Sequence, residues 1–164
     1  MQLDDLVALE QIKRLKYAYF RCLDQKRWAE MATLFAPDAT AAYSGGKYHY
    51  EGRDAIVAFM QQNMDRPAFH TSHRVHHPEI ELLSPTEATG TWAMEDVNVD
   101  TEYDFYLTGA GFYEDRYVKV DDRWVFAHTG YKRTFETMMP MSRNGMNLTA
   151  SWWSTDGQSM LEVQ

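Results

Sequence analysis

The stretch FHTSHRVHHPEIELLSPTEATGTWAMEDVNVD, residues 69–100, marks the point at which the hydrophobic pattern of the chain changes. From here apolar and polar residues alternate, as they do in strands whose successive side chains face opposite sides of a sheet. Ser84-Pro85 separates two such runs, 69–83 and 87–100, and two more follow at 103–120 and 123–136. The second half of the chain therefore predicts a long antiparallel meander.

The first half of the chain has helical periodicity instead. Apolar residues recur at helical spacing from Leu6 to Leu23, which predicts a helix over about residues 5–24, with Asp4 and Asp5 complementing its start. The remaining expected elements are a short helix at 27–35 that Pro37-Asp38 stops, a hairpin of strands 40–43 and 48–51 around a Gly-containing loop at 44–47, and a helix at 53–64.

Three helices followed by a meander predict an α+β fold, with the helices packed on one side of a curved, mainly antiparallel sheet. A chain of 164 residues with 45% hydrophobic residues is the size of one domain with a sizeable core. We see no internal repeat, low-complexity tract or linker between domains.

Composition excludes several classes of protein. The net charge is −8 and the basic residues are scattered, so nucleic acid is not an expected partner. The acidic N-terminus does not resemble a secretory signal, and no window approaches the roughly 20 apolar residues of a membrane span. These features predict a cytoplasmic protein without a membrane partner. Cys22 is the only cysteine, which excludes an intrachain disulfide and a cysteine-based zinc cluster.

Four of the six histidines lie between residues 70 and 77, which raises the question of a metal site. On a strand, His70 and His76 would share one face, and His73 and His77 the other. The strand rise separates the members of each pair by about 13 Å or more, whereas zinc ligands converge at about 2 Å from one ion. We therefore expect no metal, and we expect the histidines other than His73 to be polar strand or turn residues.

Two carboxylates stand out against apolar patterns. Asp96 has the same strand parity as Gly90, Trp92 and Met94, so it is expected on the apolar face, where a carboxylate is costly without partners or protonation. Asp24 lies at the C-terminal end of the first predicted helix, where its charge opposes the helix dipole. Either acid could simply be solvated at the end of its element, but both are candidate site residues.

The order of the segments KYAYFRCLDQKRWAEMATLFAPDA, HTSHRVHHPEIEL, ATGTWAMEDV and GFYEDRYVKVDDRWVF resembles the SnoaL-like branch of the nuclear-transport-factor-2-like superfamily. Members include dehydratases, a dehydrochlorinase and polyketide cyclases. The resemblance covers roughly residues 5–136 and implies a cone-shaped α+β barrel with an apolar pocket. Because the superfamily also holds binding and assembly domains, fold alone does not fix function.

The resemblance also implies roles for particular residues. Asp24 and His73 match the Asp-His dyad of the family, Tyr19 matches a tyrosine of the dehydratases, and Asp96 matches an acid on the middle strand. A basic residue on the last strand matches Arg133, with Lys132 as the alternative. The residues expected to contact substrate are Tyr17, Tyr43, Trp92, Met94 and His128.

The chemistry of these residue types is that of elimination or isomerisation. An imidazole can accept a proton near neutral pH, and a carboxylate on its other nitrogen fixes the tautomer. Tyr19 could donate a hydrogen bond to the substrate, and Asp96 could act as an acid if its surroundings keep it protonated. No nucleophile elbow, phosphate-binding loop or dinucleotide fingerprint is present. We expect a cofactor-independent lyase or isomerase acting on a small hydrophobic cyclic molecule, or alternatively a non-catalytic binding or assembly domain.

The tail, residues 137–164, holds five of the ten methionines but has no regular periodicity. It is not expected to form a sheet strand. We expect a barrel domain at 1–136 and a tail that packs either as a lid on the pocket or against a neighbouring subunit. A homo-oligomer, a dimer or trimer formed through the outer face of the sheet, is expected as well.

Overall fold

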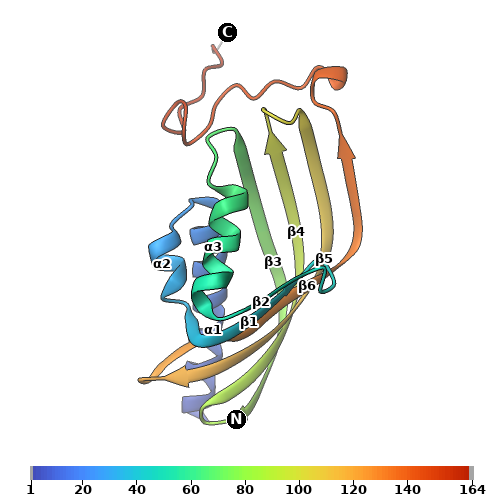
Figure 1. Ribbon diagram of the computed structural model, residues 1–164. Helices are drawn as coiled ribbons and strands as arrows, with labels where there is room; N and C mark the ends of the chain where they lie inside the picture. Colours follow the sequence, from blue (N-terminus) through green and yellow to red (C-terminus); the bar gives the residue numbers. More distant parts are fainter. Residues whose placement is uncertain (1, 163–164) are drawn as a thin grey trace.

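The computed structural model describes residues 2–162, and its helices and strands follow the predicted order (Figure 1). The elements are α1 (Leu3–Asp24), α2 (Trp28–Ala32), β1 (Phe35–Tyr43), β2 (Tyr48–Glu51), α3 (Arg53–Met64), β3 (Phe69–Ser84), β4 (Glu87–Asp100), β5 (Phe105–Val120), β6 (Arg123–Met139) and the 3₁₀ turn η1 (Ser142–Asn144). None of the helices within residues 2–162 has the length and apolar character to cross a membrane.

Within the described residues, six strands form one sheet in the order β2-β1-β6-β5-β4-β3. All neighbouring pairs are antiparallel except β1 and β6, which run parallel. The sheet curves around the helices, and its ends, β2 and β3, stay apart as edges in the described part of the chain (Figure 1). The α+β class and the mainly antiparallel curved sheet are thus confirmed, although the cone is completed by helices rather than by closure of the sheet.

Strand alternation decides which side chains face the helices. On β4 the buried residues are those of even number from Ala88 to Asp96, and Glu95 is exposed on the other side. On α1 the buried stripe includes Ile12, Leu15 and Tyr19. α1 contacts β3 and α3 contacts β1, so the concave face of the sheet and the apolar sides of the helices enclose one core.

The largest departure from the predicted elements lies between residues 27 and 43. The expected second helix is only five residues long, and β1 begins at Phe35 rather than at residue 40. Pro37, expected to stop a helix, lies inside β1, where the pairing with β6 shifts register between Phe35 and Thr40. A bulge tolerates proline because the missing amide hydrogen is not needed there.

The last strand also runs further than expected. β6 ends at Met139, so the first three residues of the predicted tail belong to the sheet. Beyond η1 the chain is irregular and crosses the end of the sheet near the C-terminal ends of α1 and α3 (Figure 1). Met141 is buried, and the ring of Trp153 lies 4.7 Å from the Lys26 ammonium nitrogen.

Candidate active site

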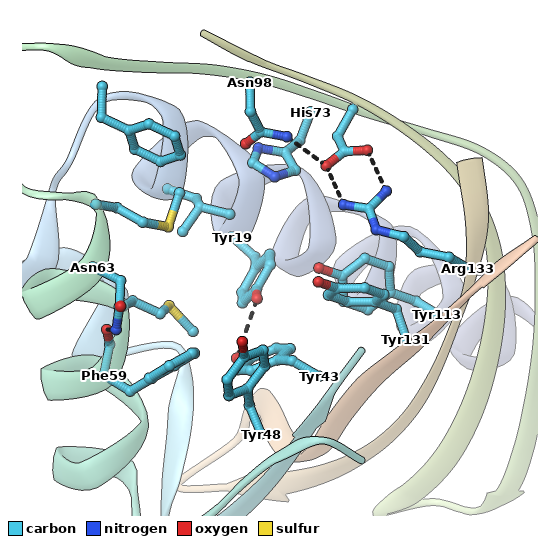
Figure 2. A pocket seen from close by; sticks show the side chains of 15 residues that line it. Tyr19, Tyr43, Tyr48, Phe59, Asn63, His73, Asn98, Tyr113, Tyr131 and Arg133 are labelled. Atoms are coloured by element: carbon cyan, nitrogen blue, oxygen red, sulfur yellow. Dashed lines mark hydrogen bonds and ion pairs between the residues drawn. The ribbon is translucent and has the colours of Figure 1, made fainter. Parts of the chain in front are cut away.

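A cavity of about 200 Å³ lies between the concave face of the sheet and α1 and α3 (Figure 2). A volume of this size suits one substituted ring. One part of its lining is apolar and comes mainly from the helices: Leu23, Phe59, Met60, Met64 and Phe69. The remaining lining is polar: Tyr19, Tyr43, Tyr48, Asn63, His73, Asp96, Asn98, Tyr113, Tyr131 and Arg133.

Asp24 and His73 form a hydrogen-bonded pair at this cavity. Asp24 is the last residue of α1, and its Oδ1 lies 2.7 Å from His73 Nδ1 on β3. The Asp24 carboxylate also accepts bonds from the backbone N–H of His73 at 2.9 Å and from the hydroxyl of Thr71 at 2.8 Å. These three donors explain how an acid is held at the unfavourable end of a helix. Because Asp24 occupies Nδ1, Nε2 is the ring nitrogen left for a substrate.

The His73 ring is fixed by packing as well. Phe20, one turn before Asp24 on α1, stacks on the imidazole with ring centroids 5.5 Å apart and an interplanar angle of 22°. The side chain of His73 is only 10% exposed. The imidazole is therefore held in one orientation and is largely shielded from water.

Asp96 and Arg133 form a second pair across the cavity lining. The Arg133 guanidinium donates two bonds of 2.7 Å to the Asp96 carboxylate, and the Asn98 amide donates another of 2.8 Å (Figure 2). Burial favours the neutral acid, but the bonds and charge of Arg133 outweigh it and hold the pKa of Asp96 below its usual range. The surroundings of Asp96 therefore do not keep it protonated, and the acid role suggested by its apolar neighbours does not fit.

Of the two basic candidates on β6, Arg133 faces the cavity and Lys132 does not. Arg133 lines the cavity, and its Nε lies 2.7 Å from Glu136. Lys132 points to the outer side of β6, where its ammonium lies 3.3 Å from Glu114 and both side chains are largely exposed. Adjacent residues of a strand face opposite ways, so only one of the two can reach the cavity.

Tyrosine hydroxyls supply most of the remaining polar lining. Tyr19 donates to the Tyr43 hydroxyl at 3.3 Å, and the rings of Tyr113 and Tyr131 lie 5.3 Å apart beside them (Figure 2). Burial raises the pKa of each of these four hydroxyls above its ordinary value. They are therefore protonated at neutral pH and can act as hydrogen-bond donors.

The other predicted substrate contacts lie outside the lining of this cavity. Trp92 and Met94 are buried in the core, and the Trp92 indole N–H donates to the Tyr117 hydroxyl at 2.8 Å. Tyr17 is 51% exposed on α1. His128 Nδ1 lies 2.6 Å from the Thr40 hydroxyl, and burial, helped by the charge of Arg116, lowers the pKa of His128.

The histidine cluster separates only in part as its strand parity predicts, because His77, expected on the face of His73, has a positive φ at a break in the β3–β4 register. Of His70, His73, His76 and His77, only His73 lines the cavity, and His76 and His77 are exposed. Within residues 2–162, no three or more His, Cys, Asp or Glu side chains come together in a group that could hold a metal ion.

Several residues that line the cavity or hold the dyad escaped the sequence analysis. Asn98 and Thr71 have the same strand parity as Asp96 and His73, so the period-two pattern could have found them. Tyr113 and Tyr131 meet only because β5 and β6 pair with Tyr113 opposite Tyr131. Their meeting depends on that register, which the alternation of one strand does not specify.

Comparisons with known proteins agree with this architecture. A family model described as a SnoaL-like domain matches residues 4–130. The chain is similar to a putative scytalone dehydratase from Novosphingobium aromaticivorans, with 28% identity and a TM-score of 0.76 over 84% of this chain and 91% of that one. It shares the fold of hexachlorocyclohexane dehydrochlorinase LinA-type3 from Novosphingobium barchaimii, with 19% identity and a TM-score of 0.74 over 84% and 93% of the two chains. It also shares the fold of ActVI-ORFA from Streptomyces coelicolor, with 15% identity and a TM-score of 0.66 over 77% and 97%.

Proposed function

Because the chain belongs to the SnoaL-like family, we propose that it is a cofactor-independent lyase or isomerase in which His73 is the general base. The observation that carries this proposal is the bond of 2.7 Å between Asp24 Oδ1 and His73 Nδ1, with His73 at the wall of the cavity. A domain that only binds a ligand or assembles would not need an imidazole oriented in this way.

The dyad supports proton abstraction from carbon. The Asp24 carboxylate places the proton of the neutral ring on Nδ1, so that Nε2 carries the lone pair that accepts the substrate proton. Asp24 then stabilises the imidazolium that forms. The shielding of His73 by Phe20 keeps water from competing with the substrate.

The tyrosine hydroxyls are suited to the negative charge that develops on a substrate oxygen. Protonated donors that the fold holds in place stabilise an enolate-like oxygen without reorganising. Tyr19 and Tyr43 already share a hydrogen bond, and a substrate carbonyl would become an additional acceptor for this pair.

A leaving hydroxyl group also needs a proton, which Asp96 cannot supply while Arg133 holds it ionised. We assign this proton to the His73 imidazolium. His73 would take a proton from carbon, the C–O bond would break, and the same proton would leave with the hydroxyl group as water. In an isomerisation the proton would return to carbon instead.

The lining also favours one class of substrate. The buried hydroxyl groups of Tyr19, Tyr43 and Tyr113 penalise a ligand that cannot bond to them, so the cavity is suited to a small ring bearing hydroxyl or carbonyl oxygens rather than to a halogenated hydrocarbon. This argument favours dehydration of a cyclic hydroxyketone over dehydrohalogenation. It agrees with the name of the relative that is 28% identical.

A screen of steroids, polyphenols and cyclic hydroxyketones for shifts in melting temperature would identify a substrate. With that substrate, His73→Ala should lower kcat by about 10² to 10⁴-fold, because a general base contributes that much. Asp24→Asn should be nearly as damaging. His76→Ala, an exposed position on the same strand, is the matched control and should keep full activity. If both dyad variants retained most activity, the proposed mechanism would be excluded.

We also propose that the protein is a cytoplasmic homo-oligomer. Phe112 and Phe135 are 47% and 56% exposed on β5 and β6, and apolar side chains of this size would be covered in a subunit contact. Light scattering should give a mass two or three times that of the chain. Phe112→Ser should lower the mass if the contact forms there, whereas a monomeric wild-type protein would contradict the oligomer.

A further inference from the structure

The proposed mechanism leaves one pair of charged residues unexplained. Lys16 on α1 and Asp115 on β5 have no exposed side-chain surface, and their charged atoms lie 2.7 Å apart. The Asp115 carboxylate also accepts bonds from the hydroxyl of Tyr117 at 2.7 Å and from that of Thr129 at 2.8 Å. A buried ion pair is often no more stable than apolar residues of the same volume, so its retention calls for another reason.

The position of the Lys16 ammonium supplies that reason. Its nitrogen lies 3.6 Å from the centre of the Tyr113 ring, against the face of the phenol. The Phe20 ring, which stacks on His73, is 5.2 Å away. Tyr113 is 2% exposed and lines the cavity beside the dyad, so the ammonium lies directly behind one wall of the site.

We propose that Lys16 is a positioning residue that polarises the Tyr113 hydroxyl, making it a stronger donor to a negatively charged oxygen of a bound substrate. A cation on the face of a phenol withdraws electron density from the ring and makes the hydroxyl a better hydrogen-bond donor. This inference rests on the proposed function, because it assigns Tyr113 a substrate oxygen as its partner.

The opposite charge of Asp115 does not cancel this effect. Asp115 is two residues from Tyr113 on the same face of β5, or about 7 Å along the strand. Three donors share its charge, whereas Lys16 is in contact with the ring itself. The ion pair therefore acts as a dipole whose positive end faces Tyr113.

The protonation of Lys16 gives the effect a pH dependence. Burial lowers the pKa of Lys16 to about 8, and the charge and hydrogen bond of Asp115 oppose that change. The groups that face the ammonium are the Asp115 carboxylate and the rings of Tyr19, Phe20, Tyr113 and Phe126. Lys16 is charged at neutral pH and loses its charge as the pH rises above about 8, so the polarisation should fade over that range.

The test uses two single-ring probes of nearly equal size. 4-Nitrophenol becomes an anion whose absorbance differs from that of the neutral phenol, whereas 4-nitroanisole stays neutral.

In Lys16→Met/Asp115→Asn, both charges are removed together, which avoids leaving one of them buried alone. We expect this double variant to bind the phenolate roughly three- to tenfold more weakly than the wild type does at pH 7 and to bind 4-nitroanisole equally well. The wild-type preference for the phenolate should decline above pH 8, and that of the variant should not.

Tyr113→Phe keeps the ring and removes the hydroxyl group. In this background, removing the two charges should have no further effect on phenolate binding. The proposal is overturned if the double variant loses affinity for both probes equally, if its phenolate affinity is unchanged, or if the loss persists in Tyr113→Phe. Failure of the wild type to bind either probe would overturn it too. Since no turnover is measured, these outcomes are independent of whether His73 acts as a base.

Discussion

At Gly109, β5 leaves the space that the Arg133 guanidinium fills beside Asp96. A Cβ atom placed on Gly109 would overlap that guanidinium and approach the backbone oxygen of Phe135. The glycine therefore permits a bidentate ion pair to lie flat against the sheet. Without this pair, the nearly buried carboxylate of Asp96 would keep Asn98 as its remaining side-chain partner.

Gly109→Ala should displace Arg133 from Asp96 while leaving the fold intact. The free energy of unfolding should fall by about 1–3 kcal/mol, the usual cost of a buried polar group that loses its partner. The Nε–H signal of Arg133 in nitrogen-15 NMR should move at the same time. Ala110→Ser, on the other side of the same strand, is the matched control. An unchanged Arg133 signal in Gly109→Ala would show that the space is not needed.

At the scale of the elements, the sequence predicted some strands and their inward faces correctly and placed other boundaries wrongly. The alternation in residues 87–100 correctly predicted β4, the inward direction of Asp96 and the outward direction of Glu95, because a strand's period depends only on local order. The boundary between α2 and β1 was wrong, because β1 extends by pairing with β6, almost ninety residues later in the chain. Tyr113 and Tyr131 of the cavity wall escaped prediction for the same reason, because they meet through the pairing of β5 with β6.

Asp100, the last residue of β4, links the loop between α3 and β3 to the turn after β4, and its charge should make the stability of the fold depend on pH. Its buried carboxylate accepts bonds from the Arg66 guanidinium and from the backbone N–H groups of Glu102 and Tyr103. Burial favours the neutral acid, but these bonds outweigh it and lower the pKa of Asp100. An acid whose pKa is lowered by folding stabilises the folded state at pH values above its unfolded-state pKa, which is near 4 for Asp. This contribution is lost as the pH falls through the lower pKa of the folded state.

Asp100→Asn should therefore lower the free energy of unfolding by about 1–3 kcal/mol at pH 7. The difference from the wild type should narrow in urea titrations below about pH 4. Asp38→Asn, an exposed position on β1, should show neither effect. A difference for Asp100→Asn that stayed constant down to the lowest pH would contradict the proposed role of its charge.

At the scale of the whole molecule, the irregular tail lies against the domain that carries it. Trp153 covers the ammonium of Lys26, which also donates to the backbone oxygen of Arg66. Lys26 follows Asp24 by two residues, so the tail reaches the end of the molecule where the dyad lies. This contact favours the expected lid over the expected subunit contact, although the tail does not itself line the cavity.

Truncation after Gly145 keeps η1 and its bonds to Asp104 and removes Trp153. The shortened protein should remain folded and bind the ring probes more weakly, because water gains access to the cavity. Trp153→Ala should reproduce part of this loss of affinity for the probes. Trp152→Ala should not, because the Trp152 side chain is 60% exposed. Unchanged binding together with a lower mass in light scattering would assign the tail to the subunit contact instead.

The parallel pairing of β1 with β6 also affects how the protein is made. β1 emerges from the ribosome well before β6, yet within residues 2–162 its partners in the sheet are the short strand β2 and β6, which ends at Met139. Until that strand is synthesised, β1 presents an open edge and α1 has an apolar side without the finished sheet to cover it. The nascent chain should therefore depend on chaperones until β6 has been synthesised, and a ribosome stalled before residue 123 should hold a protease-sensitive chain.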